Sequence, residues 1–494
     1  MKSYLLIAFT GMSLAAFAQK PANPKPYAAT ITAAELKTHL YIVAGKEMEG
    51  RETATEGQRK AAAYIQDHFK ALGLAPGNGT SYQQAFPVYT DKNGSTSIEV
   101  NGQESYDILP NGAIEATYYL SEIVFVGDGI TDSTHDSYKG LDVAGKAVLI
   151  MPGKSGMRRS RNAGSNFVEN ARLHGAAVIL FPMSNINPGR YGGGMYTNAY
   201  KATAGPNFYM MSDYIAKNIL GDSYKADSAA VKNGNAVSRV VKAEIVLKNK
   251  KSIERMESTN VLGVIEGSDK KDEYLFVTAH YDHIGVHDGV INYGADDDGS
   301  GTVAIIEMAQ AFMKAKAEGK GPRRTIVFMC VSGEEKGLWG SEYYSDHPIF
   351  PLDKTTADLN IDMIGRIDPL HKGKDSANYV YVVGDDKLSS DLRPISEAAN
   401  KKYTKMALDY KFNAPNDPER IYYRSDHYNF ARKGVPVIFY FNGVHADYHK
   451  PTDTPDKINY ELLAKRTQLV FYTAWEMANR DGMLKRDIPL PSMN

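Results

Sequence analysis

Residues 274–301 read YLFVTAHYDHIGVHDGVINYGADDDGSG, and this stretch decides the fold. Its first part, 274–280, is an almost continuous apolar run, which is typical of a strand covered on both faces. A turn rich in glycine and aspartate, 294–301, leads into residues 301–317, where apolar side chains recur at helical spacing. A buried strand, a polar turn and then a helix are the repeating unit of an α/β domain.

The same alternation continues on both sides of this stretch. Further apolar runs with the length of buried strands lie at 260–265, 325–331, 359–363, 379–383 and 437–441. Closer to the N-terminus, residues 57–72 have a helical pattern that stops at Gly73, and Thr32 can cap a helix that starts at Ala33. We therefore predict a three-layer helix–sheet–helix domain with a mixed, mostly parallel central sheet.

Residues 95–243 have a different character. Short β-type runs, such as 147–151, alternate there with turns rich in glycine, aspartate and serine. This block contains no group of carboxylates and histidines with the spacing of metal ligands. We predict that it is an inserted, β-rich domain, and that the α/β domain is formed by residues 19–94 together with residues 244–494.

The first residues have the pattern of a secretory signal peptide. Lys2 supplies a positive charge, residues 4–16 form an apolar run, and Ala16-Phe17-Ala18 is a cleavage site with small residues at its first and third positions. No cysteine follows that could accept a bacterial lipid anchor, and no later segment resembles a membrane span. We predict a cleaved signal peptide, 1–18, and a periplasmic or secreted protein.

The amino-acid composition argues against nucleic acid as a partner and limits which residues could bind a metal. The 494 residues include 57 Lys and Arg and 58 Asp and Glu, so there is no overall basic field to attract nucleic acid. The single cysteine, Cys330, lies in an apolar run and excludes both an internal disulfide framework and a multi-cysteine metal site. Any metal would therefore be held by His, Asp and Glu. The sequence leaves the oligomeric state open.

Polar side chains follow one predicted strand after another in the α/β half. They lie in the segments 280–283, 296–298, 332–335, 362 and 445–454. Carboxylates that meet at the carboxyl ends of strands repel one another by on the order of several kcal/mol unless a cation neutralises them. Imidazoles and carboxylates without a thiolate suit zinc, although cobalt or manganese could substitute. More than four ligand groups suit two ions that share one carboxylate.

These motifs resemble those of the di-zinc exopeptidase family that contains bacterial leucyl aminopeptidases, glutamate carboxypeptidase II and glutaminyl cyclases. The matching segments are AHYDH (279–283), GADDDGSG (294–301), SGEEKGLWGS (332–341), NIDMIG (360–365) and DYHKPTDT (447–454). The segment MEGR (48–51) is also similar to the opening of that family. The resemblance covers most of the chain and implies the three-layer zinc exopeptidase fold.

The resemblance implies two zinc ions per chain and a ligand set for them. One zinc would be bound by His280 and Asp362, the other by Glu335 and His449, and Asp297 would bridge both. The family often has a cis peptide bond after the bridging aspartate, which here would join Asp297 to Asp298.

The resemblance also implies two residues that act on the reaction or on a ligand. Glu334 would be the general base that activates water and returns the proton to the leaving amine. Asp282, two residues after His280, would accept a hydrogen bond from the imidazole and fix its tautomer. These two side chains would therefore stay free of metal.

The inserted block resembles a protease-associated domain through residues 125–130, 136–148 and 171–181. In relatives this module can overhang the active-site cleft. A role in restricting substrate entry is a hypothesis for this chain.

Other residues give weaker signals. Ser425-Asp426-His427 resembles a family segment near the site and either supports a ligand or caps a helix. We expect His283 and His445 to line the cleft rather than to bind metal. Residues 422–424, Tyr-Tyr-Arg, either bind substrate or pack against the core.

The leading interpretation is a zinc aminopeptidase. It would hydrolyse the first peptide bond of peptides or proteins by attack of a hydroxide that bridges the two zincs, with Glu334 as base. A carboxypeptidase of the glutamate-releasing type would need a cluster of arginines, for which Arg366, Arg420 and Arg424 are scattered candidates. A glutaminyl cyclase would use one zinc. A receptor-like binding protein on the same fold would have lost ligands that this chain retains.

Overall fold

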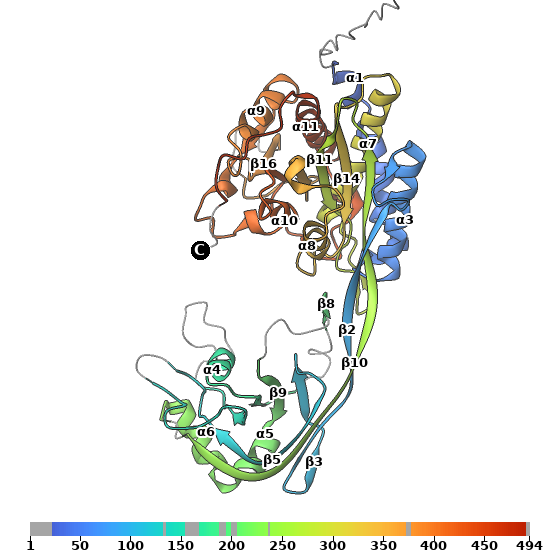
Figure 1. Ribbon diagram of the computed structural model, residues 1–494. Helices are drawn as coiled ribbons and strands as arrows, with labels where there is room; N and C mark the ends of the chain where they lie inside the picture. Colours follow the sequence, from blue (N-terminus) through green and yellow to red (C-terminus); the bar gives the residue numbers. More distant parts are fainter. Residues whose placement is uncertain are drawn as a thin grey trace, which may run out of the picture. The chain divides into compact units, whose positions relative to one another are not determined.

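The structure is a computed structural model that describes residues 22–131, 135–153, 167–186, 194–198, 205–235, 238–371 and 377–490. The predicted signal peptide, 1–18, lies outside these residues. The chain forms two compact units, Met1–Phe86 with Glu257–Asn494 and Pro87–Met256 (Figure 1). Both borders fall within long strands, β2 (Gln83–Val100) and β10 (Arg239–Ile265), and the domain limits expected from the sequence fall in the same two strands.

The first unit is built on a mixed sheet. From one edge, the strands are β17 (Ala407–Asp409), β16 (Tyr379–Val383), β18 (Val437–Phe441), β15 (Thr355–Ile361), β11 (Lys270–His280), β14 (Arg324–Val331), β10 and the short β1 (Ala75–Pro76). The four central strands, β18, β15, β11 and β14, are parallel to one another. Strands β16 and β10 flank them in antiparallel orientation. The predicted mixed, mostly parallel sheet is therefore confirmed.

Helices cover both faces of this sheet. One face packs against α1 (Lys25–Ala28), α2 (Ala33–Val43), α3 (Glu56–Leu72), α7 (Gly301–Ala317), α9 (Leu392–Lys402) and α11 (Tyr460–Asn479). The other face packs against α8 (Trp339–Asp346) and α10 (His427–Ala431). Side chains alternate along each strand: Leu275 and Val277 of β11 lie in the first core, and Phe276 lies in the second. The three-layer prediction is confirmed.

Local signals in the sequence set the ends of the N-terminal helices. The Thr32 hydroxyl accepts a hydrogen bond from the Glu35 amide at the start of α2. Helix α3 ends at Gly73, whose φ of 82° lies in the left-handed region that glycine adopts at little cost. Both helix boundaries agree with the sequence prediction. Helix α7 also spans the predicted residues, 301–317.

The second unit is rich in strands. Its sheet has the order β5 (Ala116–Phe125), β6 (Ala147–Leu149), β7 (Val178–Met183), β9 (Asn207–Ser212) and β4 (Ile108–Asn111). Further elements of this unit include β3 (Gln103–Ser105), β8 (Met195–Tyr196), α4 (Phe167–Leu173), α5 (Asp213–Leu220) and α6 (Tyr224–Asn233). Apolar cores lie on both faces of this sheet. The assignment as a protease-associated domain stays a prediction.

Membrane-spanning helices are absent from the described parts of the chain. None of the helices there combines the length and the apolar character that a bilayer crossing requires.

Arg51 joins the N-terminal segment to two loops that carry polar residues of the α/β half. Its fully buried guanidinium donates hydrogen bonds to the carbonyls of Tyr281 (2.7 Å), Val43 (2.9 Å), Tyr293 (2.8 Å) and Gly294 (2.9 Å). Burial lowers the pKa of Arg51 to about 10, which still leaves it charged at neutral pH. One side chain therefore holds the start of the 281–283 loop and the turn before Asp297.

Replacing Arg51 with methionine is expected to lower the unfolding free energy by at least about 3 kcal/mol, because it leaves buried carbonyls without donors. Urea unfolding of the first unit, followed by tryptophan fluorescence, measures this loss. Arg59→Met is the matched control, since the Arg59 side chain is 57% exposed, pairs with the exposed Glu56 and donates a hydrogen bond to the carbonyl of Ala54. Equal stability of the two variants would contradict the bracing role of Arg51.

Candidate metal centre

The predicted ligands meet at the carboxyl ends of the parallel strands. His280 is the last residue of β11, and Asp362 follows β15 directly. Glu335 lies in the loop after β14, and His449 lies in the loop after β18. Asp297 lies in the turn (Ala295–Ser300) before α7. Because parallel strands end at one edge of the sheet, residues far apart in sequence come together there.

One group of possible ligands consists of His280, Asp297 and Asp362. The Nε2 atom of His280 lies 3.3 Å from Oδ1 of Asp297 and 3.6 Å from Oδ1 of Asp362. All three side chains are buried. This group matches the ligand set expected for one zinc.

A second group consists of His283, Asp297 and Glu335. His283 Nδ1 lies 2.7 Å from Glu335 Oε1 and 3.9 Å from Asp297 Oδ2. His449 also reaches this group, since its Nε2 lies 2.9 Å from Glu335 Oε2 and 3.1 Å from Asp297 Oδ2. Asp297 thus belongs to both groups, which is the position expected of a bridging ligand. The expectation that His283 lines the cleft without belonging to the ligands is not met, because the structure places it among the possible ligands of this group.

The chemistry of these atoms fits a metal. Within the described residues, the buried atoms His280 Nε2, His283 Nδ1, Asp297 Oδ2 and Glu335 Oε1 form no hydrogen bond of ordinary geometry, although buried polar atoms normally do. Their close contacts are with one another and with His449. Nitrogen and carboxylate oxygen atoms at these distances are suited to share cations. Burial alone would raise the pKa of Asp297, but the close imidazoles of His280 and His449 hold it well below the usual range. The carboxylate is therefore ionised, as a ligand must be.

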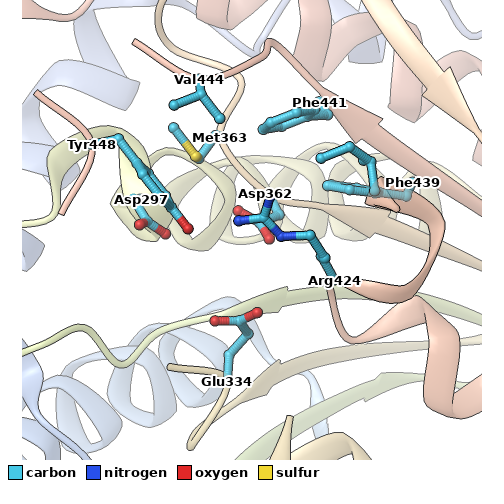
Figure 2. A pocket seen from close by; sticks show the side chains of 10 residues that line it. Asp297, Glu334, Asp362, Met363, Arg424, Phe439, Phe441, Val444 and Tyr448 are labelled. Atoms are coloured by element: carbon cyan, nitrogen blue, oxygen red, sulfur yellow. The ribbon is translucent and has the colours of Figure 1, made fainter. Parts of the chain in front are cut away.

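Glu334 lies beside these groups but belongs to neither of them. Its Oε2 atom is 4.0 Å from His280 Nε2, and its side chain lines the adjoining pocket, as Figure 2 shows. Burial raises the pKa of Glu334 well above its ordinary value, and the neighbouring carboxylates of Glu335 and Asp362 add to the effect. A carboxyl group with a raised pKa next to a metal centre is suited to carry a proton.

Asp282 contacts His280 in a different way from the one expected. The nearest acceptor to His280 Nδ1 is the backbone carbonyl of Asp282, at 3.1 Å, whereas the carboxylate Oδ1 is 3.7 Å away. The carboxylate instead accepts hydrogen bonds from the Thr53 hydroxyl (2.8 Å) and the Glu334 amide (3.2 Å). The reason is that β11 ends at His280, so the alternation of an extended strand no longer applies at Asp282. Asp282 therefore positions the backbone of Glu334.

The three consecutive aspartates point to different partners. Asp296 accepts from the Gly365 amide (2.6 Å) and lies 3.2 Å from His445 Nε2. Asp298 accepts from the amides of Gly301 (2.8 Å) and Met363 (3.0 Å). Only Asp297 faces both ligand groups, and the peptide bond after it is cis, as the resemblance implied.

The Ser425-Asp426-His427 segment lies directly behind the first ligand group. The Ser425 hydroxyl donates to Asp362 Oδ2 (2.7 Å), and Asp426 accepts from the Ser341 hydroxyl. The ring of His427 stacks on Phe439 at 4.8 Å between centroids. The segment therefore supports a ligand.

Ion pairs and hydrogen bonds of Asp447 hold the loop that carries His449. Asp447 accepts hydrogen bonds from Arg366 (2.9 Å), Lys457 (2.7 Å) and Thr452 (2.6 Å). The side chain of His449 itself is 38% exposed, more than any other ligand. This ion-pair network fixes the position of a ligand that packing alone does not fix.

Uptake of metal should become stronger as the pH rises. Burial would lower the pKa of His449, but its contacts with Asp297 and Glu335 outweigh burial and raise the pKa to about 10. Between pH 6 and 8 the metal-free site therefore holds a proton on His449, which a metal must displace, so affinity should rise about tenfold per pH unit for each proton released. Competition with a zinc chelator across this pH range measures the slope. An affinity independent of pH would contradict the assignment of His449 as a ligand.

A pocket adjoins the ligand groups (Figure 2). Its apolar lining consists of Met363, Ile421, Phe439, Phe441 and Val444, and its polar lining of Asp297, Glu334, Asp362, Arg424 and Tyr448. The pocket thus offers an apolar wall beside the groups that could hold metal, which is the form expected of a site for a small organic group.

Comparisons with known proteins support this picture. Residues 260–474 match the model of Peptidase family M28. Aminopeptidase YwaD of Bacillus subtilis (strain 168) is 25% identical over 272 residues, which are 53% of this chain and 54% of that protein. A probable leucine aminopeptidase of Arthroderma otae is 30% identical over 231 residues, 45% of this chain and 59% of that protein. The chain thus spans little more than half the length of these relatives.

Solved structures show the same fold. An aminopeptidase from Aneurinibacillus sp. strain AM-1 has a TM-score of 0.54 at 18% identity and covers 96% of this chain and 99% of its own. A zinc aminopeptidase from Bacillus subtilis has a TM-score of 0.50 at 19% identity, over 93% of this chain and 97% of its own. Residues 260–474 are therefore similar to peptidase family M28, in a chain that has the fold of these two solved aminopeptidases.

Proposed function

We propose that this chain is a two-zinc aminopeptidase that removes N-terminal residues from peptides or proteins outside the cytoplasm. The observation that carries the proposal is the pair of ligand groups that share Asp297, with Glu334 beside them and in neither. The signal-peptide pattern of residues 1–18 supports the location. The relatives named aminopeptidases support the reaction.

Different residues of the chain would bind the metal ions and transfer the proton. Two zinc ions, when bound, would polarise the substrate carbonyl and make water acidic enough to attack at neutral pH. His280, Asp362, Glu335, His449 and Asp297 would hold the ions, with His283 beside the second one. Glu334 takes a proton from the attacking water and passes it to the leaving amine. Of the pocket carboxyl groups, only Glu334 lies outside both ligand groups, so it is the one that can face a positively charged amino terminus.

The carboxypeptidase alternative finds little support among the described residues. Arg366 is engaged by Asp447, and Arg420 lies over the ring of Tyr423 at 5.1 Å. Of the three candidate arginines, only Arg424 lines the pocket. A cluster that grips a terminal carboxylate is therefore not formed there.

One substrate screen tests the proposal. The zinc-loaded protein is given aminoacyl amides, N-blocked dipeptides ending in glutamate, and N-terminal glutaminyl peptides, and its zinc content is measured. Cleavage of the aminoacyl amides alone, with two zincs per chain, is the expected result. Cleavage of the blocked dipeptides would favour the carboxypeptidase, and cyclisation with one zinc per chain would favour the cyclase.

A further inference from the structure

Arg424 is fixed to the candidate metal centre through its backbone. It follows the short helical turn Ile421–Tyr423 and directly precedes Ser425, whose hydroxyl donates to Asp362 at 2.7 Å. The next residue, Asp426, is anchored by Ser341. The start of the Arg424 side chain therefore cannot move far from the ligands.

The guanidinium of Arg424 lies in the pocket without an ionic partner. The side chain is exposed and projects toward the pocket between Glu334 and Phe439, as Figure 2 shows. No carboxylate of the described residues forms an ion pair with it, in contrast to Arg366. Two of the acidic groups that share the pocket, Asp297 and Asp362, belong to the ligand groups, so bound metal would take up their charge. A positive charge therefore remains available to a ligand.

The apolar lining of the pocket limits which side chains could bind beside Arg424. Met363, Phe439 and Phe441 can cover the methylene groups of a side chain while leaving its end near Arg424. The planar guanidinium forms two parallel hydrogen bonds with a carboxylate, and an apolar wall strengthens that pair. A lysine or arginine side chain in the same place would be repelled.

We propose that Arg424 selects substrates whose N-terminal residue is glutamate or aspartate. This rests on the proposed function, because it assigns the pocket to the side chain of the residue that is released. The amino terminus of the substrate would face Glu334 and the ligand groups, and its acidic side chain would pair with Arg424.

Two substrates that differ only in the charge of the side chain test the role of Arg424. Glutamyl and glutaminyl amides of one fluorogenic amine have the same shape, so the ratio of their kcat/KM values reports the carboxylate alone. For the wild type we expect the glutamyl amide to be favoured about tenfold, the usual worth of a charge-assisted contact. In Arg424→Met the ratio should fall to one or below, mainly through KM. Higher salt should lower the wild-type ratio as well.

Arg420→Met is the control, since Arg420 lies near Tyr423 outside the pocket lining and its loss should leave the ratio unchanged. Zinc content and thermal midpoint show whether Arg424→Met is folded. Equal ratios in the wild type and Arg424→Met would overturn the proposal, while cleavage of leucyl amides would keep the aminopeptidase assignment intact. If no amide is cleaved, the aminopeptidase assignment fails, and calorimetric binding of free glutamate against free glutamine to both proteins still decides the role of Arg424.

Discussion

Replacing Glu334 with glutamine should abolish most turnover while leaving both metals in place. Glutamine has the same shape but cannot take a proton, so kcat should fall by about a hundredfold to ten-thousandfold, the usual contribution of a general base. The metal content should not change, because Glu334 lies outside both ligand groups. Steady-state kinetics and elemental analysis of the same preparation measure the two quantities, and Glu334→Ala should behave alike.

The adjacent residue provides the contrast. Glu335 is a member of the second ligand group and lies 2.9 Å from His449 and 2.7 Å from His283. Glu335→Gln should therefore lose metal as well as activity, whereas Glu334→Gln should lose activity only. Wild-type turnover with intact metal in Glu334→Gln would refute its role as the base.

Replacing Asp297 with asparagine should remove metal from both positions at once. Asp297 is the one residue shared by the two ligand groups, so the loss of its charge weakens both. We expect less than one tightly held zinc per chain after gel filtration, and activity below detection. Asp297→Ala should have the same outcome with a larger loss of stability, since it also leaves a cavity.

Asp298→Asn is the matched control for this experiment. The Asp298 carboxyl accepts hydrogen bonds from Gly301 and Met363, which an amide oxygen can also accept. Burial, as the main cause, raises the pKa of Asp298 well above its usual range, so a neutral amide is a close substitute. This variant should keep its zinc. Retention of two ions per chain in Asp297→Asn would count against the bridging assignment.

The fold could be predicted closely because its signals are local. Apolar runs gave the central strands of the first unit, and Thr32 and Gly73 marked helix ends where the structure has them. The candidate ligands could be found because each follows a strand or opens a helix, and chain topology then brings them to one edge. Their assigned roles stay predictions.

Other features could not be predicted because they depend on long-range geometry. The proximity of His283 to Glu335 depends on how the chain turns after β11. The hydrophobic periodicity of the sequence does not predict the path of such a turn. The same turn moves the Asp282 carboxylate away from His280 Nδ1. The hydrogen bonds of Arg51 join segments more than two hundred residues apart, so its sequence neighbours give no sign of them. The length of β10, 27 residues, also exceeded the predicted strand at 260–265.

The two strands that connect the units have an evolutionary consequence. The chain leaves the first unit along β2 and returns along β10, and these strands pair with each other. An insertion whose ends emerge side by side does not require the host sheet to be rethreaded. Ancestral chains could therefore have gained, exchanged or lost the second unit as a whole. For the same reason, a protein engineer could insert another domain between Phe86 and Glu257.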